Sequence, residues 1–421
     1  FARRHLRRNV LALGVDFGLF LVGWSFASQS TLLPAFAAHL GAPYVVIGAI
    51  PAVMTTGWYL PSLFVAGHTQ TLAEKLPFVL RFTLWERVPF LILALVAFVL
   101  AAAAPMLALV AVLLLLLVIT LAGGLLMPAW MDIVGRTIPT EIRGRFFAFA
   151  TVLGSAGGLL GGIVTAWVLA SVPAPASYGY CFLGAAFFMT LSYVALLLVR
   201  EPPGRAQPPV DLKTHLLRVP ALLRQDPNLT WFLAARGAMV VGTMAAGFYT
   251  VHALEHLGAP AWRVGVFTSV LLAGQTVGNV ALGWLADRAG HRLVLIVGAA
   301  ASVGGNVLAL GAPSLDVFVA VFALVGMQFA AVNVSAMNVM LEFAPVVEER
   351  PTYIGLGNTA VAPLTFAAPL AGGLVAGGLG FPALFILAGL FGAAGLGLLL
   401  ACVHDPRRVP PVVPPSAAVA S

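Results

Sequence analysis

The stretch Gly283-Trp284-Leu285-Ala286-Asp287-Arg288-Ala289-Gly290-His291-Arg292 separates two long apolar segments of the chain. Its charged side chains cannot lie in hydrocarbon, so it predicts a short turn between two membrane helices, on one aqueous side. Gly283 would let two helices approach closely, and Gly290 would allow the positive φ that reverses the chain. The stretch therefore predicts that the chain crosses a membrane on either side of this turn.

The composition of the whole chain agrees with a membrane protein. Of its 421 residues, 61% are hydrophobic and 9% are charged, whereas a soluble domain has roughly 25% charged residues. The apolar runs reach twenty residues and more, which indicates spanning helices rather than the short alternating strands of a barrel. The net charge of +7 requires no nucleic-acid partner, because basic cytoplasmic loops produce the same total.

Twelve apolar segments predict an all-α integral membrane protein with twelve transmembrane helices. They form two sets of six, which predicts an N-terminal half at 1–199 and a C-terminal half at 229–403. Residues 200–228 predict a cytoplasmic linker with an amphipathic helix, and 404–421 predict a disordered tail. The expected spans are 10–37, 44–66, 84–104, 106–130, 145–170, 178–199, 229–253, 262–286, 293–312, 315–343, 352–379 and 382–403.

Two further patterns concern orientation and symmetry. With the N-terminus inside, all but two of the 22 lysine and arginine residues fall on the inner side, and Arg87 is counted among them. This bias predicts a cell inner-membrane protein with both termini in the cytoplasm. The pentapeptide His39-Leu40-Gly41-Ala42-Pro43 recurs as His256-Leu257-Gly258-Ala259-Pro260, each just after the first span of its half. The repeat indicates duplication, hence two pseudo-symmetric halves.

The pattern Gly-x-Leu-Ala-Asp-Arg-x-Gly-x-Arg at 283–292 closely resembles the signature loop of the major facilitator superfamily of secondary transporters. The resemblance implies that the two halves rock around a midplane site in alternating access. It also implies that Asp287 binds the start of a helix in the opposite half, with Arg288 and Arg292 as the basic positions of the motif. The expected partners in this chain are Arg143 and Arg145. The alternative is a loop that only fixes topology.

The corresponding loop of the first half departs from the family pattern. Thr71 stands where the acidic residue would be, and the loop is basic. We therefore expect a latch of opposite polarity, in which Lys75 or Arg81 faces acidic residues that precede the eleventh helix, namely Glu348 and Glu349. The fourth span also lacks the arginine of many proton-coupled members, which speaks against their usual antiport mechanism.

Two charged residues are predicted inside spans, at symmetry-related positions of the first and seventh helices. Asp16 and Arg236 each lie about 8–11 Å from the inner end by residue count. Because a single buried charge is costly, we expect them to pair across the transport pathway; snorkelling of Arg236 is the alternative. The neutral polar and aromatic candidates for the pathway are Trp24, Gln29, Trp58, Tyr59, Tyr249, Gln275, Asn279, Gln328, Asn333 and Asn358.

These residues favour a transporter for a small amphipathic or weakly polar solute, with efflux as the first choice. Uptake of a nutrient by symport or uniport is the alternative, and a receptor or scaffold on the same fold represents another class. No catalytic motif, cofactor or metal site is expected. A proton or sodium ion could be coupled, although few embedded carboxylates argue against multi-proton coupling. The expected partners are the solute and the lipid bilayer, and the expected state is a monomer.

Overall fold

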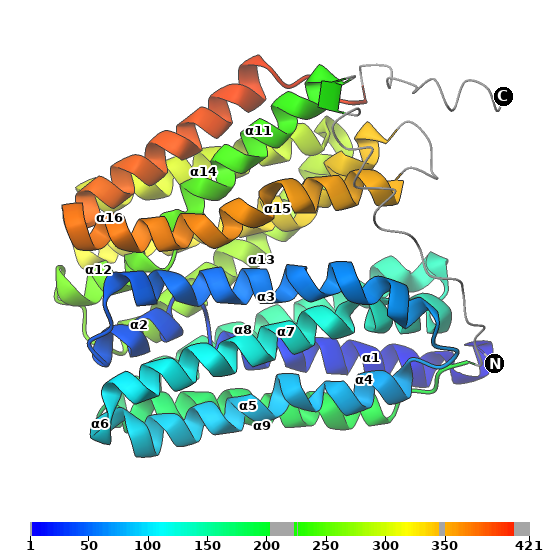
Figure 1. The fold of residues 1–421 in the computed structure, drawn as a ribbon, viewed down its shortest axis with the longest axis horizontal. Coiled ribbons are helices and arrows are strands. Elements are labelled where there is room, and N and C mark those ends of the chain that lie inside the picture. The colour runs from blue at the N-terminus through cyan, green and yellow to red at the C-terminus, as the bar shows by residue number, and fades with distance from the viewer. Residues whose placement is uncertain (1, 203–222, 225, 345–349, 408–421) are drawn as a thin grey trace. The chain divides into compact units, whose positions relative to one another are not determined.

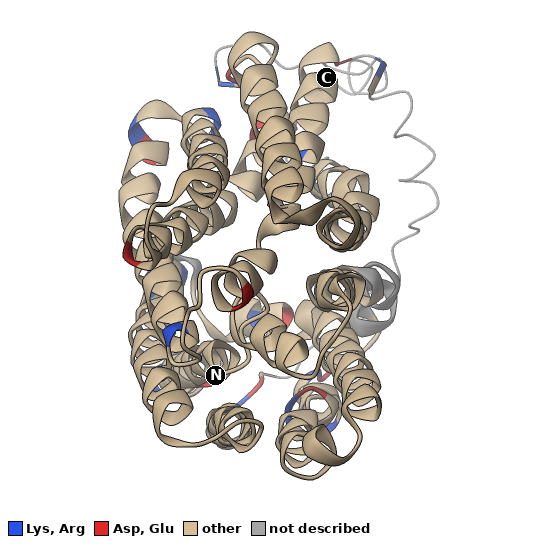
Figure 2. Cartoon of the chain, turned by 90° about the vertical axis from the view of Figure 1, so that its left-hand side faces the viewer, with Lys and Arg blue, Asp and Glu red and all other residues tan. Residues whose placement is uncertain are grey.

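The computed structural model describes residues 2–202, 223–224, 226–344 and 350–407, and within these ranges the regular structure is helical, without strands. Figure 1 shows the helices as a ribbon. The chain divides into two compact units: Phe1–Val210 with Gly247–Leu272 form unit 1, and Asp211–Ala246 with Ala273–Ser421 form unit 2. Positions of Lys, Arg, Asp and Glu are sparse along the helices (Figure 2).

Unit 1 contains the helices of the first half and a short part of the second half. The helices of the first half are α1 (Ala2–Ser25), α2 (Leu32–His39), α3 (Tyr44–Gln70), α4 (Leu76–Phe82), α5 (Leu84–Leu95), the π-helix η1 (Val96–Leu100), α6 (Ala101–Ala103), α7 (Pro105–Thr137), α8 (Thr140–Ser171) and α9 (Ala176–Leu197). To these the unit adds α12 (Phe248–Glu255) and the first residues of α13 (Arg263–Ala289).

Small residues set how closely the helices of unit 1 approach. Within the unit, α1 packs against α8 and α9, and α3 packs against α7. A Cβ added at Gly157 of α8 would lie 2.4 Å from Val22 of α1, and one at Gly57 of α3 would lie 2.0 Å from the hydroxyl oxygen of Thr120. These separations are shorter than any real Cβ contact, so only glycine permits the observed helix spacing.

Unit 2 contains the rest of the second half. Its helices are α11 (Pro227–Gly242), the 3₁₀-helix η2 (Thr243–Ala245), the inner part of α13, α14 (His291–Gly311), α15 (Leu315–Phe343) and α16 (Arg350–Ala401). α16 packs against α11 and α14, and α14 packs against α15. Gly380 interrupts α16 with φ 84° and ψ 170°, so α16 comprises two consecutive helices.

The prediction of a twelve-helix membrane protein is confirmed. Nine helices of the described part are long and apolar enough to span a bilayer, and the longest, Tyr353–Ala401, contains the turn at Gly380 and supplies two spans. The first two spans are α1 and α3. Several boundaries differ from the prediction: the third span begins at Leu76 rather than at residue 84, α1 ends at Ser25 rather than at residue 37, and α7 continues to Thr137 rather than ending at residue 130.

The two copies of the repeated pentapeptide also share a backbone conformation. Gly41 and Gly258, the central residues of the two pentapeptides, have φ values of 75° and 65°, and both close the turn after a helix. The ends of the halves also match. Asn9 of α1 makes two hydrogen bonds to the backbone of Arg200, and Asn228 of α11 makes the same two to His404. Equivalent contacts at equivalent places agree with duplication of a six-helix unit.

The two connecting segments are described in part. The amphipathic helix predicted within 200–228 falls mainly on residues 203–222, outside the described residues. Of the predicted tail, residues 408–421 are also outside the described residues, and Arg407 is within them: its Nε donates to Glu342 Oε1 at 2.5 Å. The described chain therefore continues in contact with unit 2 beyond the last span.

Candidate functional site

An ionic cluster is buried among the helices of unit 1. Arg87 Nη2 of α5 donates to Asp16 Oδ1 of α1 at 2.8 Å. The same carboxylate accepts hydrogen bonds from Ser192 Oγ of α9 at 2.6 Å and from Trp130 Nε1 of α7 at 3.1 Å. Asp16 is only 2% exposed. Four helices therefore converge on one carboxylate, which is the arrangement that a charge inside a membrane protein requires.

Glu86 adds a second carboxylate to this cluster. Its Oε2 accepts a hydrogen bond from Thr83 at 3.2 Å and lies 3.3 Å from Arg87 Nη1, and the residue is 5% exposed. A Cβ at Gly123 of α7 would lie 2.7 Å from Glu86 Oε1, so the glycine provides the space that this carboxyl group occupies. The cluster, defined as Asp16, Glu86 and Arg87, thus holds two carboxylates and one guanidinium group.

Aromatic side chains cover one side of the cluster. The guanidinium carbon of Arg87 lies 5.6 Å from the ring centroid of Phe20, which makes edge contacts with Trp24 at 6.2 Å and Trp58 at 6.3 Å. Trp24 also contacts Phe90 at 5.3 Å. Trp24 and Trp58, two of the predicted pathway residues, therefore lie beside the charged cluster. Their closeness to it is not evident from the sequence.

The structure pairs Asp16 with Arg87, and the predicted pairing with Arg236, which belongs to unit 2, stays a prediction. The sequence counts Arg87 with the charges of the inner side, three residues into the predicted span 84–104. Since the third span begins at Leu76, Arg87 instead lies about 16 Å along it, at a rise of about 1.5 Å per residue. Arg236 Nη2 donates to Asn358 Oδ1 at 3.4 Å in unit 2. The adjacent pair Glu86-Arg87 inside an apolar run was the signal for a buried cluster.

The other predicted pathway residues differ in burial. Tyr249 and Gln328 are buried at 3% and 5% exposure, and Tyr59 is 41% exposed. Gln29, Gln275 and Asn279 are half-buried, and Asn333 is exposed. Within unit 1, α12 and the first residues of α13 are joined to the first half by polar contacts: the hydroxyls of Thr31 and Thr268 are 2.6 Å apart, and Thr250 Oγ1 donates to Ser30 O at 2.9 Å. We call this the outer seam.

The predicted gating residues of unit 1 are held within that unit. Lys75 Nζ of the first-half loop donates to Asp132 Oδ2 at 2.6 Å, and Glu201 accepts from the backbone N–H of Lys75 at 2.8 Å. Arg143 Nη2 donates to the carbonyls of Gly135 and Ile138, at the end of α7, and Arg145 is exposed. Glu348 and Glu349, the partners expected for the first-half loop, lie outside the described residues.

The sequence predicts two features of the stretch 283–292, a chain reversal at Gly290 and a close helix approach at Gly283. Gly290 has φ 93°, which confirms the expected reversal. A Cβ at Gly283 would meet no described atom within 4 Å, so the expected close approach is not made within unit 2. Arg292 donates to the carbonyl of Leu399 at 2.7 Å, and Arg288 lies 4.0 Å from the ring centroid of Trp284. Asp287 is exposed, and its latch with Arg143 or Arg145 stays a prediction.

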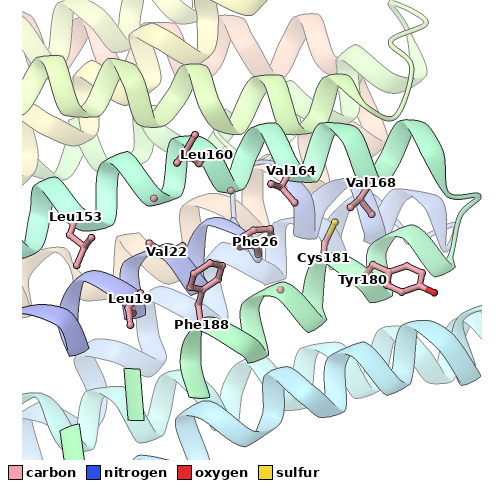
Figure 3. A pocket seen from close by; sticks show the side chains of 13 residues that line it. Leu19, Val22, Phe26, Leu153, Leu160, Val164, Val168, Tyr180, Cys181 and Phe188 are labelled. Atoms are coloured by element: carbon pink, nitrogen blue, oxygen red, sulfur yellow. The ribbon is translucent and has the colours of Figure 1, made fainter. Parts of the chain in front are cut away.

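An apolar groove of about 500 Å³ lies between α1, α8 and α9 in unit 1. Figure 3 shows Leu19, Val22 and Phe26 lining it from α1, Leu160 and Val164 from α8, and Phe188 from α9. None of the predicted pathway residues lines it. Because its lining lacks charges, it offers no means of orienting a polar solute.

Comparisons with known proteins agree with this architecture. A family model described as Major Facilitator Superfamily matches residues 15–271 and 232–420. The chain belongs to the major facilitator superfamily. It is therefore a multi-pass membrane transporter of the secondary type, and not an enzyme.

Three solved structures illustrate how far the superfamily fold is shared. The nucleoside transporter NupG (D323A mutant) is 15% identical, with a TM-score of 0.71 over 93% of this chain and 99% of NupG. A D-xylose-proton symporter is 15% identical, with a TM-score of 0.68 over 94% and 98%. A bacterial homologue of the lysosomal transporter Spinster is 13% identical, with a TM-score of 0.66 over 95% of each chain. No curated protein matches the sequence. At these identities the structures show a shared fold, and not a shared solute.

Proposed function

We propose that this transporter moves a small amphipathic or weakly polar solute outward across the inner membrane by alternating access, coupled to a proton. The observation that carries the proposal is the buried cluster of Asp16, Glu86 and Arg87 beside the aromatic rings of Trp24 and Trp58. Aromatic walls suit the apolar body of an amphipathic solute, and a compact charged group provides the coupling element.

Charge balance supports a proton as the coupled ion. The cluster has one more carboxylate than guanidinium groups, and both carboxylates are at least 95% buried, since Asp16 and Glu86 are 2% and 5% exposed. Excess negative charge inside a membrane protein is costly. A proton on one carboxylate removes this excess, and hydroxyl and indole donors hold Asp16 without needing a second cation. A single coupled proton is consistent with the sequence, which argues only against multi-proton coupling.

The outer seam supports alternating access. The segment Gly247–Leu272 belongs to the second half in sequence but groups with the first half in unit 1. Hydroxyl and carbonyl groups join it through Thr31–Thr268, Thr250–Ser30 and Ser269–Leu159. We propose that these few hydrogen bonds form the outer gate and break when the site opens outward. On the inner side, the proposed latch joins Asp287 to Arg143 or Arg145, with the N-terminus and the C-terminus cytoplasmic.

The test is flux through purified transporter in liposomes, with ethidium as the amphipathic probe and a neutral monosaccharide as the polar one. We expect ethidium flux above that of protein-free liposomes, and faster flux when a pH gradient is imposed. Glu86→Gln and Asp16→Asn should remove the response to the gradient. Glu74→Gln, which neutralises an exposed carboxylate of the inner loop, is the matched control and should retain it.

The alternatives give different results in the same assay. Sugar flux without ethidium flux would favour nutrient uptake over efflux. No flux of either probe, from either side, would leave the receptor or scaffold hypothesis and remove the proposed efflux. Flux that responds equally to the gradient in wild type and in Glu86→Gln would show that the cluster is not the coupling site.

A further inference from the structure

The outer end of the seventh span carries an arrangement that the transport function does not use. The last residues of α12 and the residue after it read His252-Ala253-Leu254-Glu255-His256. Residues separated by three and four positions share one face of a helix. His252, Glu255 and His256 therefore lie on one face, and the same order of residues provides two zinc ligands in a class of zinc peptidases.

The geometry of the two imidazole rings fits a shared ion. Their centroids are 5.2 Å apart and their planes differ by 17°. A zinc ion bonds a histidine nitrogen at about 2.0–2.1 Å and so lies about 3 Å from the ring centre. The rings are stacked, so one of them must rotate about its side-chain torsions before both can bond one ion, and their separation is short enough for that ion to lie between them. His256 is exposed and His252 is half-buried, so an ion can reach the pair.

We propose that His252 and His256 form a bidentate site for a divalent transition-metal ion, with zinc as the representative case. Imidazole nitrogens suit Zn²⁺, Cu²⁺ and Ni²⁺ and are poor ligands for Mg²⁺ or Ca²⁺. Glu255 is not part of the proposed pair; its Oε2 accepts a 2.6 Å hydrogen bond from the Tyr44 hydroxyl of α3. Among the described residues no group of three or more metal-ligating side chains occurs, so water completes the coordination.

The internal repeat provides a natural comparison within the chain. His256 corresponds to His39, since both begin the repeated pentapeptide. Four residues before His39 stands Ala35, where the second half has His252. The first copy thus has one histidine and the second copy has two at chelating distance. A metal should bind the second copy and not the first, which makes His39 the matched control.

The direct test is titration of Zn²⁺ into the purified full chain without a polyhistidine tag, measured by calorimetry. We expect one ion per chain in the wild type and in His39→Ala. We expect binding at least about tenfold weaker in His252→Ala and in His256→Ala, since even outer-shell changes at metal sites cost 10–100-fold. Equal binding by wild type and both variants would overturn the proposal. The assay needs no solute flux, so its outcome is independent of the proposed function.

A second measurement uses only the wild-type chain and therefore does not depend on the variants folding. Diethyl pyrocarbonate modifies accessible histidines, and mass spectrometry locates the modified residues. Zn²⁺ should protect His256 from modification and leave the labelling of His39 unchanged. Labelling of His256 that is insensitive to Zn²⁺ would also overturn the proposal.

Discussion

Three glycines of α7 allow the packing around the buried cluster to be tested with one substitution at three positions. An added Cβ at Gly135 meets nothing within 4 Å. At Gly123 it would lie 2.7 Å from both Glu86 Oε1 and the indole ring of Trp58. At Gly124 it would lie 2.5 Å and 2.6 Å from the backbone carbonyl oxygens of Trp58 and Gly57. The substitution is Gly→Ala, so helix propensity changes equally and only the surroundings differ.

The magnitudes follow from these contacts. Alanine is favoured over glycine in a helix by about 0.5–1 kcal/mol, so Gly135→Ala should be slightly stabilising. Overpacking a membrane core against side chains costs about 1–3 kcal/mol, which at Gly123 exceeds the gain in propensity. At Gly124 the added methyl group would meet backbone atoms of α3, which cannot move aside by a side-chain rotation. The helices α3 and α7 would therefore have to separate. Its cost should reach about 3 kcal/mol or more.

The assay is thermal unfolding of purified protein in detergent, followed by tryptophan fluorescence, with proton-driven flux measured in parallel. We expect unfolding temperatures in the order Gly135→Ala, wild type, Gly123→Ala, Gly124→Ala. Gly123→Ala should also lose gradient-driven flux, because it displaces Glu86 from the cluster. Equal unfolding temperatures for the Gly135 and Gly124 variants would refute the assigned packing of α3 on α7.

Three further predictions concern contacts away from the cluster. In a chain without its native cysteines, a disulfide between Thr31→Cys and Thr268→Cys should form readily, because the two hydroxyls are 2.6 Å apart. The disulfide should stop flux until it is reduced. Full flux in the cross-linked protein would contradict the proposed outer gate. Asp287→Asn should slow the transport cycle more than Thr71→Ala, measured as turnover in liposomes; equal effects would argue against the latch. Asn9→Ala removes two hydrogen bonds of 2.9 Å to Arg200 and should lower the free energy of unfolding by about 1–3 kcal/mol; an unchanged unfolding temperature would show that this contact does not hold the end of the first half.

Much of the fold could be predicted because the relevant physics is local. A run of apolar residues long enough to cross hydrocarbon must form a helix, since each backbone polar group must be satisfied within its own segment. The twelve spans follow from this requirement. The reversal at Gly290 follows from the freedom of glycine to adopt φ 93°. The repeated pentapeptide likewise anticipated the matching turns at Gly41 and Gly258.

The pairing of charges could not be predicted in this way. Arg87 lies next to Glu86 in sequence, yet its closest partner, Asp16, is on another helix. Which helices meet depends on where glycine lets them approach, as at Gly57 and Gly123. Hydropathy assigns a residue to a span or to a loop, but it does not state the depth at which two spans face each other. The inner boundary at Leu76, and hence the burial of Arg87, was missed for this reason.

The sequence alone thus determined that the chain is a duplicated bundle of membrane helices with the signature turn at 283–292. Tertiary structure decided which side chains form its charged centre. Asp16 is joined to Arg87, Ser192 and Trp130 across 71, 176 and 114 positions of the chain. A buried carboxylate takes whichever donors the packed helices present to it, and that set exists only after the helices have assembled.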